Sequence, residues 1–538
     1  MRQELLWRGQ LDFLYAFQNE KKIFSAADHR FKQTVVFAAK GGNTTLFRTR
    51  LRMGVGDSPN AHEIPADILR NDHRAMEFTT DELRTISPKT LSVVELGNRR
   101  DLDIFRTIYL NSFRIGKGMD GWKIDYAQEV NMTSDSKQFP PLDKWELRDF
   151  KPDLFGRWVG PDGAIALPLY QGRVIHHFDF WAGRYLHGAG RNVRWADNPQ
   201  DEKLVRPQYL MSALDFRRHV VDQSRLRVAM RDVARSTDTR TLIAAAVPAF
   251  PCNHKVPILS ISDSSVQKTV CLAALLSSLL FDFVVRVRLG GTSLVWSMLA
   301  ECPLPLIQLE RKSEIRLVHN STCLTLLHRH FAPEWMKLKE LYPELADREW
   351  KHWWAVTEAD RLRLRVEIDA LSADLYGLEP DDFDWIVRDD PKDPKGFYRV
   401  DRQLPFRERL TGLAAAAFRA LKDGKWSADS AANLSNDEFF EIVGIPEMTT
   451  GPDPLIKKRE GCHRWKPEEF GKDDPRYGWT WDHCWQDAVA LLGSEEAVRR
   501  YVEQMEEKPT EKEAPTNYDG RTDLFGQPLP PKQGKLFQ

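Results

Sequence analysis

The residues from Gly116 to Gly121, GKGMDG, have the glycine spacing of a loop that binds a dinucleotide or S-adenosylmethionine. A loop of that kind follows a buried strand and opens a helix. The segment after it, WKIDYAQEV, has the pattern of a strand instead. We therefore interpret these glycines as a turn and not as a cofactor site.

A second pattern could belong to the active site of a nuclease. Pro380-Asp381 followed by Asp393-Pro394-Lys395 matches the bare PD…(D/E)xK pattern of metal-dependent nucleases. That chemistry needs its carboxylates and lysine on adjacent strands, and proline removes strand hydrogen bonds. The segment is also acidic throughout, with Asp382, Asp384, Asp389 and Asp390. The pattern favours a solvated acidic loop, and we assign no catalytic residue to it.

Two Cys–His pairs, Cys462-His463 and His483-Cys484, could meet as a metal site. Their spacing fits no established metal-binding pattern. The tryptophans around them, at Trp465, Trp479, Trp481 and Trp485, are typical of an aromatic core. The chain has 6 cysteines and no CxxC pair, so we predict reduced thiols and no metal.

The fourth pattern is basic. From Arg206 to Arg240 the chain has 8 arginines against 4 aspartates. Arg227, Arg231 and Arg235 have the spacing of one helix face, which would suit phosphate contacts and guanine recognition in DNA. We add Arg240 to these DNA-binding candidates. Because aspartates interleave, a solvated or internally paired face is the alternative.

The elements that position these residues begin with two strands. LDFLYAF and TVVFAAK are apolar runs, the second ending at Gly41-Gly42, with a basic segment between them and a helix before them. Two buried strands are not a domain, and the chain offers no sheet upstream of them. We therefore expect the rest of that sheet on another polypeptide.

The periodicity of apolar residues predicts further helices and strands. A helical stretch begins near Ser92, loops and short strands fill residues 116–205, and TLIAAAVP has the pattern of a strand. Val270 to Val285 predicts one buried helix, too short for a membrane span of roughly 20 residues. In DRLRLRVEIDALSADLYG, apolar residues share a helical face and Gly377 suits a C-terminal cap.

The bulk composition is that of an ordinary soluble protein. With 42% hydrophobic residues and a net charge of −1, it argues neither for nor against nucleic acid. The N-terminal residues do not resemble a signal peptide, so we expect a cytoplasmic protein with no membrane partner. From residue 506 the composition turns polar and predicts a disordered tail.

Read in order, several segments resemble the C-terminal half of large adenine-specific DNA methyltransferases, a group that includes the type IIG restriction–modification enzymes and the methyltransferases of BREX and DISARM phage-defence systems. The resemblance covers roughly residues 10 to 400. Its segments are FQNEKKIFSAADHRFKQTVVFAAKGG, LSVVELGNRRDLDIFRTIY, LPLYQGRVIHHFDFWAGRY, RLRVAMRDVARSTDTRTLIAAAVP, LLSSLLFDFVVRVRLGGTSLVWSMLAECPLP and LRVEIDALSADLYGLEPDDFDWIV.

The resemblance implies an α+β chain in which terminal strands of a methyltransferase α/β sheet precede a mixed α+β target-recognition domain with helical supports. The implied divisions are closing strands at 1–42, recognition region at 43–330, helical support at 331–424, Trp-rich accessory region at 425–505 and tail at 506–538. By position, Phe31 resembles the family's aromatic that stacks on the flipped adenine, and a hairpin-core phenylalanine is the alternative. Lys32, Arg173 and His176 are further candidates for DNA contact.

The chain departs from the family in its chemistry. The family binds S-adenosylmethionine through a glycine-containing loop and positions adenine with an NPPY-like tetrapeptide, and neither occurs here. We expect a DNA-recognition half that needs a methyltransferase catalytic subunit, which would bind S-adenosylmethionine. A complete nuclease and a structural scaffold subunit of a defence complex are the alternatives.

The C-terminal residues QGKLFQ resemble the QxxLF-type peptide that docks into the bacterial sliding clamp. The matching positions are Gln533, Leu536 and Phe537. The alternative is that the tail folds back and covers an apolar patch on its own chain.

Overall fold

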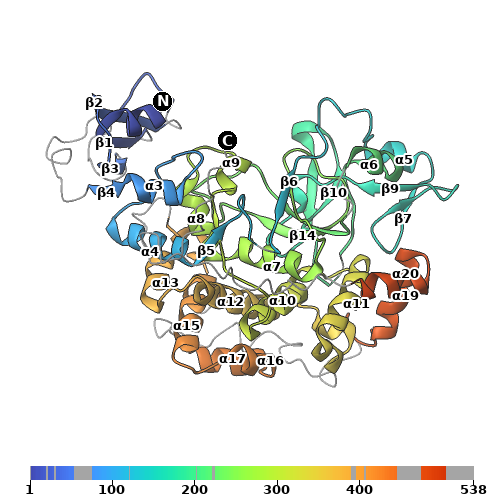
Figure 1. The fold of residues 1–538 in the computed structure, drawn as a ribbon. Coiled ribbons are helices and arrows are strands. Elements are labelled where there is room, and N and C mark those ends of the chain that lie inside the picture. Colours follow the sequence, from blue (N-terminus) through green and yellow to red (C-terminus); the bar gives the residue numbers. More distant parts are fainter. Residues whose placement is uncertain are drawn as a thin grey trace, which may run out of the picture.

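The chain is an α+β protein, and its coordinates are those of a computed structural model (Figure 1). The structure describes residues 2–19, 22–28, 32–53, 75–119, 121–201, 203–220, 224–388, 396–404, 408–444 and 474–504. A central sheet and a layer of helices form the body, and a small sheet at the N-terminus stands at one corner of it (Figure 1).

The N-terminal sheet contains the two expected strands and two more. Its order is β2-β1-β3-β4, with β1 antiparallel to β2 and parallel to β3. The elements are α1 (Arg2–Trp7), β1 (Gly9–Gln18), β2 (Lys32–Lys40), β3 (Leu46–Met53) and β4 (Met76–Thr79). The expected strand pair is therefore confirmed, whereas the boundary at residue 42 is wrong, because it cuts through a sheet that the chain itself extends.

The central sheet has the order β14-β13-β15-β6, and every residue of its inner strands is buried. Its strands are β6 (Ile124–Ala127), β13 (Leu226–Met230), β14 (Ala244–Pro248) and β15 (Ile258–Ile261). The apolar run TLIAAAVP thus forms β14 as predicted. A short pair beside it joins β5 (Ser112–Arg114) to β16 (Pro303–Pro305).

Residues 116–205 form loops and short strands, as predicted. A peripheral sheet has the order β12-β9-β8-β7, and a separate hairpin joins β10 to β11. The elements are α5 (Leu142–Glu146), β7 (Lys151–Pro152), β8 (Trp158–Val159), β9 (Ile165–Pro168), η2 (Gly172–Val174), β10 (Gly183–His187), η3 (Gly190–Asn192), β11 (Arg194–Asp197), β12 (Leu210–Ser212) and α6 (Ala213–His219).

The most apolar segment is buried as predicted, but it forms two helices and not one. They are α7 (Val266–Ser277) and α8 (Leu279–Arg288), bent by 63° at Ser278. The Ser278 hydroxyl accepts a hydrogen bond from the N–H of Phe281 at 3.1 Å, and so caps α8. Among the described helices, none is long and apolar enough by itself to cross a membrane, and this bent pair reaches that length and composition only when its two parts are joined.

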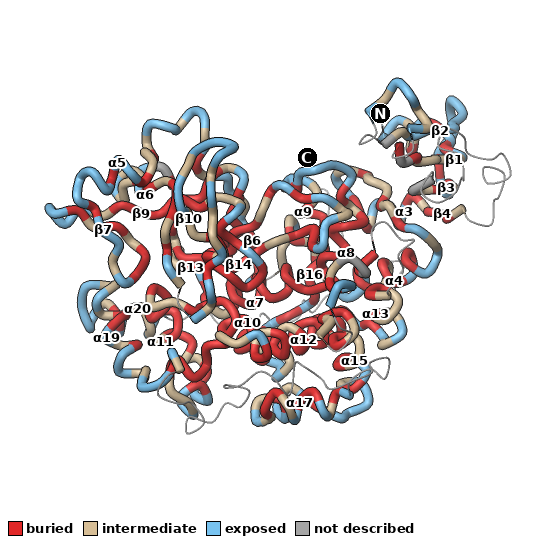
Figure 2. The backbone as a smooth tube through the Cα atoms, turned by 180° about the vertical axis from the view of Figure 1, so that it is seen from behind, coloured by how far each residue is buried: buried red, intermediate tan, exposed pale blue. Residues whose placement is uncertain are grey.

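Helices cover the central sheet from below, and the deepest of them are buried along most of their length (Figure 2). The helix predicted around residue 364 is α12, and Gly377 follows it with φ +72°, as expected for a C-terminal cap. The remaining elements are α3 (Thr80–Ile86), α4 (Arg99–Leu110), α9 (Trp296–Leu299), α10 (Lys312–Thr325), η4 (Arg329–Phe331), α11 (Ala332–Leu341), η5 (Pro343–Asp347), η6 (Trp350–Trp353), α12 (Glu358–Leu375), α13 (Pro380–Val387), α14 (Tyr398–Asp401), α15 (Leu410–Lys422), α16 (Ala428–Ala432), α17 (Asn436–Val443), α19 (Trp481–Leu492) and α20 (Glu495–Glu503).

One large hydrophobic core joins most of these parts, and two smaller clusters lie around the peripheral sheet. The buried residues of the large core run from Leu6 in α1 to Val498 in α20. A buried carboxylate links two of the helices, because Glu367 of α12 accepts hydrogen bonds from Arg316 and Asn320 of α10 at 2.8 and 2.9 Å. The expected divisions at residues 330 and 424 do not separate independent cores.

Candidate nucleic-acid interface

The predicted arginine stripe does not exist as a helix face. Arg227 lies in β13, and Arg231 and Arg235 lie in the segment that connects β13 to β14. The Arg227 guanidinium is fully buried, donates to the carbonyl of Phe250 at 2.8 Å and forms an ion pair with Glu129. The arginine spacing predicts a helix, but the β-branched and apolar neighbours of Arg227 favour a strand, and the structure has the strand.

Arg240 is also internal. Its side chain is 8% exposed, lies 3.8 Å from the carboxylate of Asp282 and donates to the carbonyl of Ser277. Arg227 and Arg240 therefore stabilise the protein interior, and the hypothesis that they contact DNA is withdrawn. Arg235, by contrast, is exposed and stays a candidate.

Arg173 and Arg231 bring two positive charges together beside η2. The Arg173 side chain is 61% exposed, and its only ion pair within the described residues is a 3.9 Å contact with the fully exposed Asp197. The Arg231 guanidinium donates to the carbonyl of Ile175. Desolvation, followed by the charge of Arg173, lowers the pKa of Arg231 to about 10. Two adjacent guanidinium groups with little counter-charge are suited to a phosphate.

The loop after η2 is held in one conformation. The backbone groups of His176 and Asp179 exchange two hydrogen bonds of 3.0 Å, and Phe178 between them has φ +53°. The Asp179 carboxylate accepts from Lys203 and Gln200 at 2.7 Å each. This bracing fixes the direction in which the loop presents His176.

His176 faces the surface with a neutral ring. Desolvation, together with the charges of Arg231 and Arg365, lowers its pKa to about 4. At neutral pH the imidazole is therefore a hydrogen-bond donor or acceptor without charge. That suits contact with a base edge better than neutralisation of a phosphate.

The β10–β11 hairpin adds basic residues that were not predicted from the sequence. Arg184, His187, Arg191 and Arg194 lie on it or in its turn, and all but Arg184 are exposed. Asp197 is the one carboxylate between residues 183 and 197. The signal was present in the segment GRYLHGAGRNVRWAD, whose charge is one-sided over 15 residues.

At the opposite corner of the molecule, β2 is an edge strand with apolar side chains in solvent (Figure 1). Val35, Val36 and Phe37 are 37%, 41% and 50% exposed. Consecutive residues of a strand point to opposite faces, so both faces of β2 carry exposed apolar side chains that the described part of the chain does not cover. An edge of this kind is a template for pairing with a further strand.

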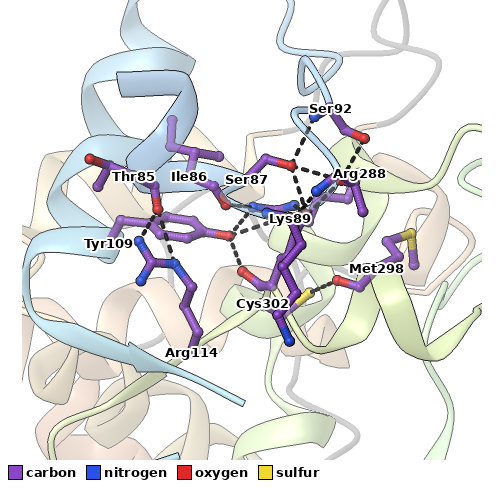
Figure 3. Close-up of polar contacts among 12 residues, drawn as sticks. Thr85, Ile86, Ser87, Lys89, Ser92, Tyr109, Arg114, Arg288, Met298 and Cys302 are labelled. Atoms are coloured by element: carbon purple, nitrogen blue, oxygen red, sulfur yellow. Dashed lines mark hydrogen bonds and ion pairs between the residues drawn. The ribbon is translucent and has the colours of Figure 1, made fainter. Parts of the chain in front are cut away.

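A buried polar network ties the segment after α3 to the body (Figure 3). The Glu301 carboxylate accepts from the hydroxyl of Ser87 at 2.7 Å and from the N–H groups of Lys89 and Thr90 at 2.9 and 2.8 Å. Arg288 of α8 lies 3.4 Å from the same carboxylate. The segment that follows α3 is therefore tied to α8 and to the turn after α9.

The hydroxyl of Tyr109 completes this network. It donates to the carbonyl of Glu301 at 2.8 Å and accepts from Arg288 Nε at 2.9 Å. Burial raises the pKa of Tyr109 well above its usual range, so the phenol stays protonated. Because every group in the network has a partner, we assign it a structural role and not a catalytic one.

The other patterns from the sequence have structural roles where they are described. GKGMDG is a turn that leads into β6, and a Cβ at Gly116 would lie 2.5 Å from the side chain of Ala300. The acidic segment is not a loop at its start, because Asp381, Asp382 and Asp384 lie in α13. Asp381 and Asp384 form ion pairs with Arg419, at 2.9 and 2.5 Å.

Several candidates lie outside the described residues. They are Phe31, Asp389, Asp390, the Asp393–Lys395 segment, the Cys462-His463 pair and the tail residues Gln533, Leu536 and Phe537. Lys32 begins β2, and its side chain is likewise not described. Within the described ranges, no group of three or more His, Cys, Asp and Glu residues could hold a metal ion.

No protein-family model and no curated protein matches the sequence. Among solved structures, the chain is similar to the type IIL restriction–modification enzyme MmeI in complex with DNA, with a TM-score of 0.29 and 9% identity. The similarity covers 69% of this chain and 44% of the MmeI chain, so this protein spans less than half the length of that enzyme.

Proposed function

We propose that this chain is the DNA-recognition half of a site-specific adenine DNA methyltransferase in a restriction–modification or phage-defence system. The observation that carries the proposal is the uncovered apolar edge of β2, since such an edge calls for a further strand to pair with it. Strands of a methyltransferase sheet are what the resemblance of residues 17–42 implies. The catalytic half that would supply them is not among these 538 residues.

The proposed DNA contacts lie on loops of the recognition region. Arg173, Arg231 and the β10–β11 hairpin provide positive charge for the phosphate backbone, and His176 provides an uncharged group for a base edge. The N-terminal sheet and this basic region stand at opposite ends of the same side of the molecule (Figure 1). A duplex held by the basic region would then pass toward a catalytic half attached to β2.

The described residues do not fit S-adenosylmethionine. The one glycine-rich segment with the right spacing ends in a strand, and Ala300 fills the space beside Gly116. The cofactor would therefore belong to the catalytic half, where it would supply the methyl group. The role of this chain would be to bind the target sequence and present an adenine for flipping.

The test is methylation of plasmid DNA with S-adenosylmethionine, using this chain with and without the catalytic half encoded beside it. We expect methylation at one sequence only when both are present, and duplex binding by this chain alone. Methylation by the catalytic half without this chain would contradict the proposal. Failure of this chain to bind any duplex would favour the scaffold alternative.

A further inference from the structure

A second basic site shares Arg184 of β10 and Lys203 with the region described above. It is a pocket of about 430 Å³ between the β7–β8 turn, β10, the segment around residue 203, η4 and η6. Its volume is within the range of roughly 300–1,000 Å³ that small-molecule sites occupy. Apolar side chains form part of the wall, namely Leu204, Val205, Leu327 and Trp354.

The most unusual group in this pocket is Lys351. Its side chain is buried, and its ammonium lies 3.3 Å from the ring centre of Trp479 and 4.6 Å from that of Trp354. Within the described residues it has no carboxylate partner and no hydrogen-bond acceptor. Aromatic faces attract a cation but do not replace the anion or water that an ammonium loses on burial. Desolvation, followed by the charge of Arg329, lowers the pKa of Lys351 to about 8. Asp487, the partner of Arg329, acts on Lys351 only from a distance and raises its pKa less than desolvation and Arg329 lower it.

Arg184 is the second cation of the pocket that forms no ion pair within the described residues. Its Nε is buried and has no hydrogen-bond partner within the part of the chain that the structure describes. The other cations of the pocket are already neutralised, because Arg329 pairs with Asp487 and Lys203 pairs with Asp179. Two buried or half-buried cations thus remain, both lining the same cavity.

The acidic residues of the pocket do not offset both charges. Asp153 pairs with Arg157 at 2.7 Å, which leaves Asp201, an exposed residue. The same positive charges act on His328. Desolvation, followed by the charges of Lys351, Arg329 and Lys203, lowers the pKa of His328 to about 3. An anionic ligand would relieve this accumulation of charge.

We propose that this pocket binds a phosphate monoester of nucleotide size, with Arg184 and Lys351 on the phosphate and the apolar wall on the rest of the ligand. A phosphate monoester carries a charge near −1.5 to −2 at neutral pH, which matches two cations, whereas a carboxylate or a DNA phosphodiester carries −1. Arginine and lysine are the two side chains that most often bind phosphate groups. The site does not depend on the DNA-recognition role proposed above.

Calorimetric titration of the full chain with adenosine 5′-monophosphate tests the site, with inorganic phosphate and adenosine as comparison ligands. We expect saturable binding of the nucleotide, weaker binding of inorganic phosphate and none of adenosine. Lys351→Met keeps the stem between the tryptophans and removes the charge, and should weaken nucleotide binding by about tenfold or more. Arg184→Ala should weaken it by a similar factor.

Lys339→Met is the matched control, because Lys339 lies over the ring of Trp481 at 4.6 Å but outside the pocket. It should leave nucleotide affinity unchanged, and a thermal melt of each variant verifies that the chain is folded. Nucleotide affinity should also fall between pH 7 and pH 9, as Lys351 loses its proton. No saturable nucleotide binding, equal binding of inorganic phosphate, unchanged affinity in both pocket variants, or displacement of the nucleotide by a DNA duplex would each overturn the proposal.

Discussion

At the scale of single residues, the arginines of the recognition region fall into two classes that a substitution experiment can separate. Arg173→Ala combined with Arg231→Ala should weaken duplex binding, because these guanidinium groups are adjacent and have little counter-charge. A base contact would cost about 1–3 kcal/mol at one position of the target, and each phosphate contact would lower the salt slope by about 1. Fluorescence anisotropy over a series of salt concentrations measures both quantities.

Arg99→Ala is the control for that double variant, since Arg99 is a half-exposed arginine of α4. Its duplex affinity should equal that of the unaltered chain. If the double variant also binds duplexes with unchanged affinity and salt slope, the assignment of this surface to DNA is wrong.

Arg227 belongs to the other class, and its replacement should affect stability. Arg227→Met leaves the buried carboxylate of Glu129, 3% exposed, without its ion-pair partner. Breaking a buried pair from one side costs about 3–5 kcal/mol. Denaturant unfolding should show this loss, whereas Arg235→Met at an exposed position should change stability by less than about 0.5 kcal/mol. If the Arg227→Met variant is fully stable but binds DNA more weakly, the structural role assigned to Arg227 is wrong and Arg227 contacts DNA.

Residue types were readable from the sequence, but their environments were not. The cluster of arginines from 206 to 240 was visible, yet Arg227 and Arg240 are paired with Glu129 and Asp282, which are distant in the sequence. Ion pairs of this kind depend on tertiary contacts that spacing does not encode. Arg173 and Arg231 are both DNA-contact candidates in the sequence, and the structure adds that the charge of Arg173 acts on Arg231, whose Cγ would lie 4.0 Å from a Cβ at Gly172.

At the scale of elements, β2 is the edge strand at which we expect a further strand to pair. Val36→Lys should prevent association with the catalytic half, because a charged side chain on an edge strand opposes pairing with another strand. Val36 is 41% exposed, so the melting temperature of the isolated chain should change little. Co-purification and plasmid methylation with the catalytic half are the measurements.

Leu306→Lys provides the comparison, since Leu306 is 51% exposed and lies after β16, outside both β2 and the basic region. It should leave association and methylation intact. Association of the Val36→Lys variant at normal strength would show that β2 is not the docking edge.

Helices and strands with strong local sequence patterns were predictable, whereas a bend within an apolar helical run was not. The strands β1, β2 and β14 and the helix α12 follow from runs of apolar residues and from Gly377. The bend at Ser278 is not predictable, because two serines, Ser277 and Ser278, in an apolar run also fit a continuous helix. The fact that the Ser278 hydroxyl caps α8 becomes visible only with the backbone in place.

At the scale of the whole molecule, a single core joins regions that the sequence suggested were separate. α12 lies beyond the expected division at residue 330, and it packs with α7, α8 and α10 of the recognition region. The amino-acid composition does change along the chain, but these changes concern exposed residues and do not divide the core. Within the described residues, buried side chains continue across residues 330 and 424 (Figure 2).

This continuity predicts how truncated chains behave. A fragment of residues 43–330 would lose β1 and β2 from its sheet, and it would expose the buried faces of α7, α8 and α10 that α11 and α12 cover. Uncovering apolar surface costs roughly 25 cal/mol per Å², which exceeds the 5–15 kcal/mol of a typical folded protein after a few hundred Å². The fragment should therefore bind a hydrophobic dye and lack near-ultraviolet circular dichroism, whereas the full chain should unfold in one cooperative transition. Two separate transitions in the full chain, or a cooperatively folding 43–330 fragment that binds DNA, would show that the recognition region is an independent domain after all.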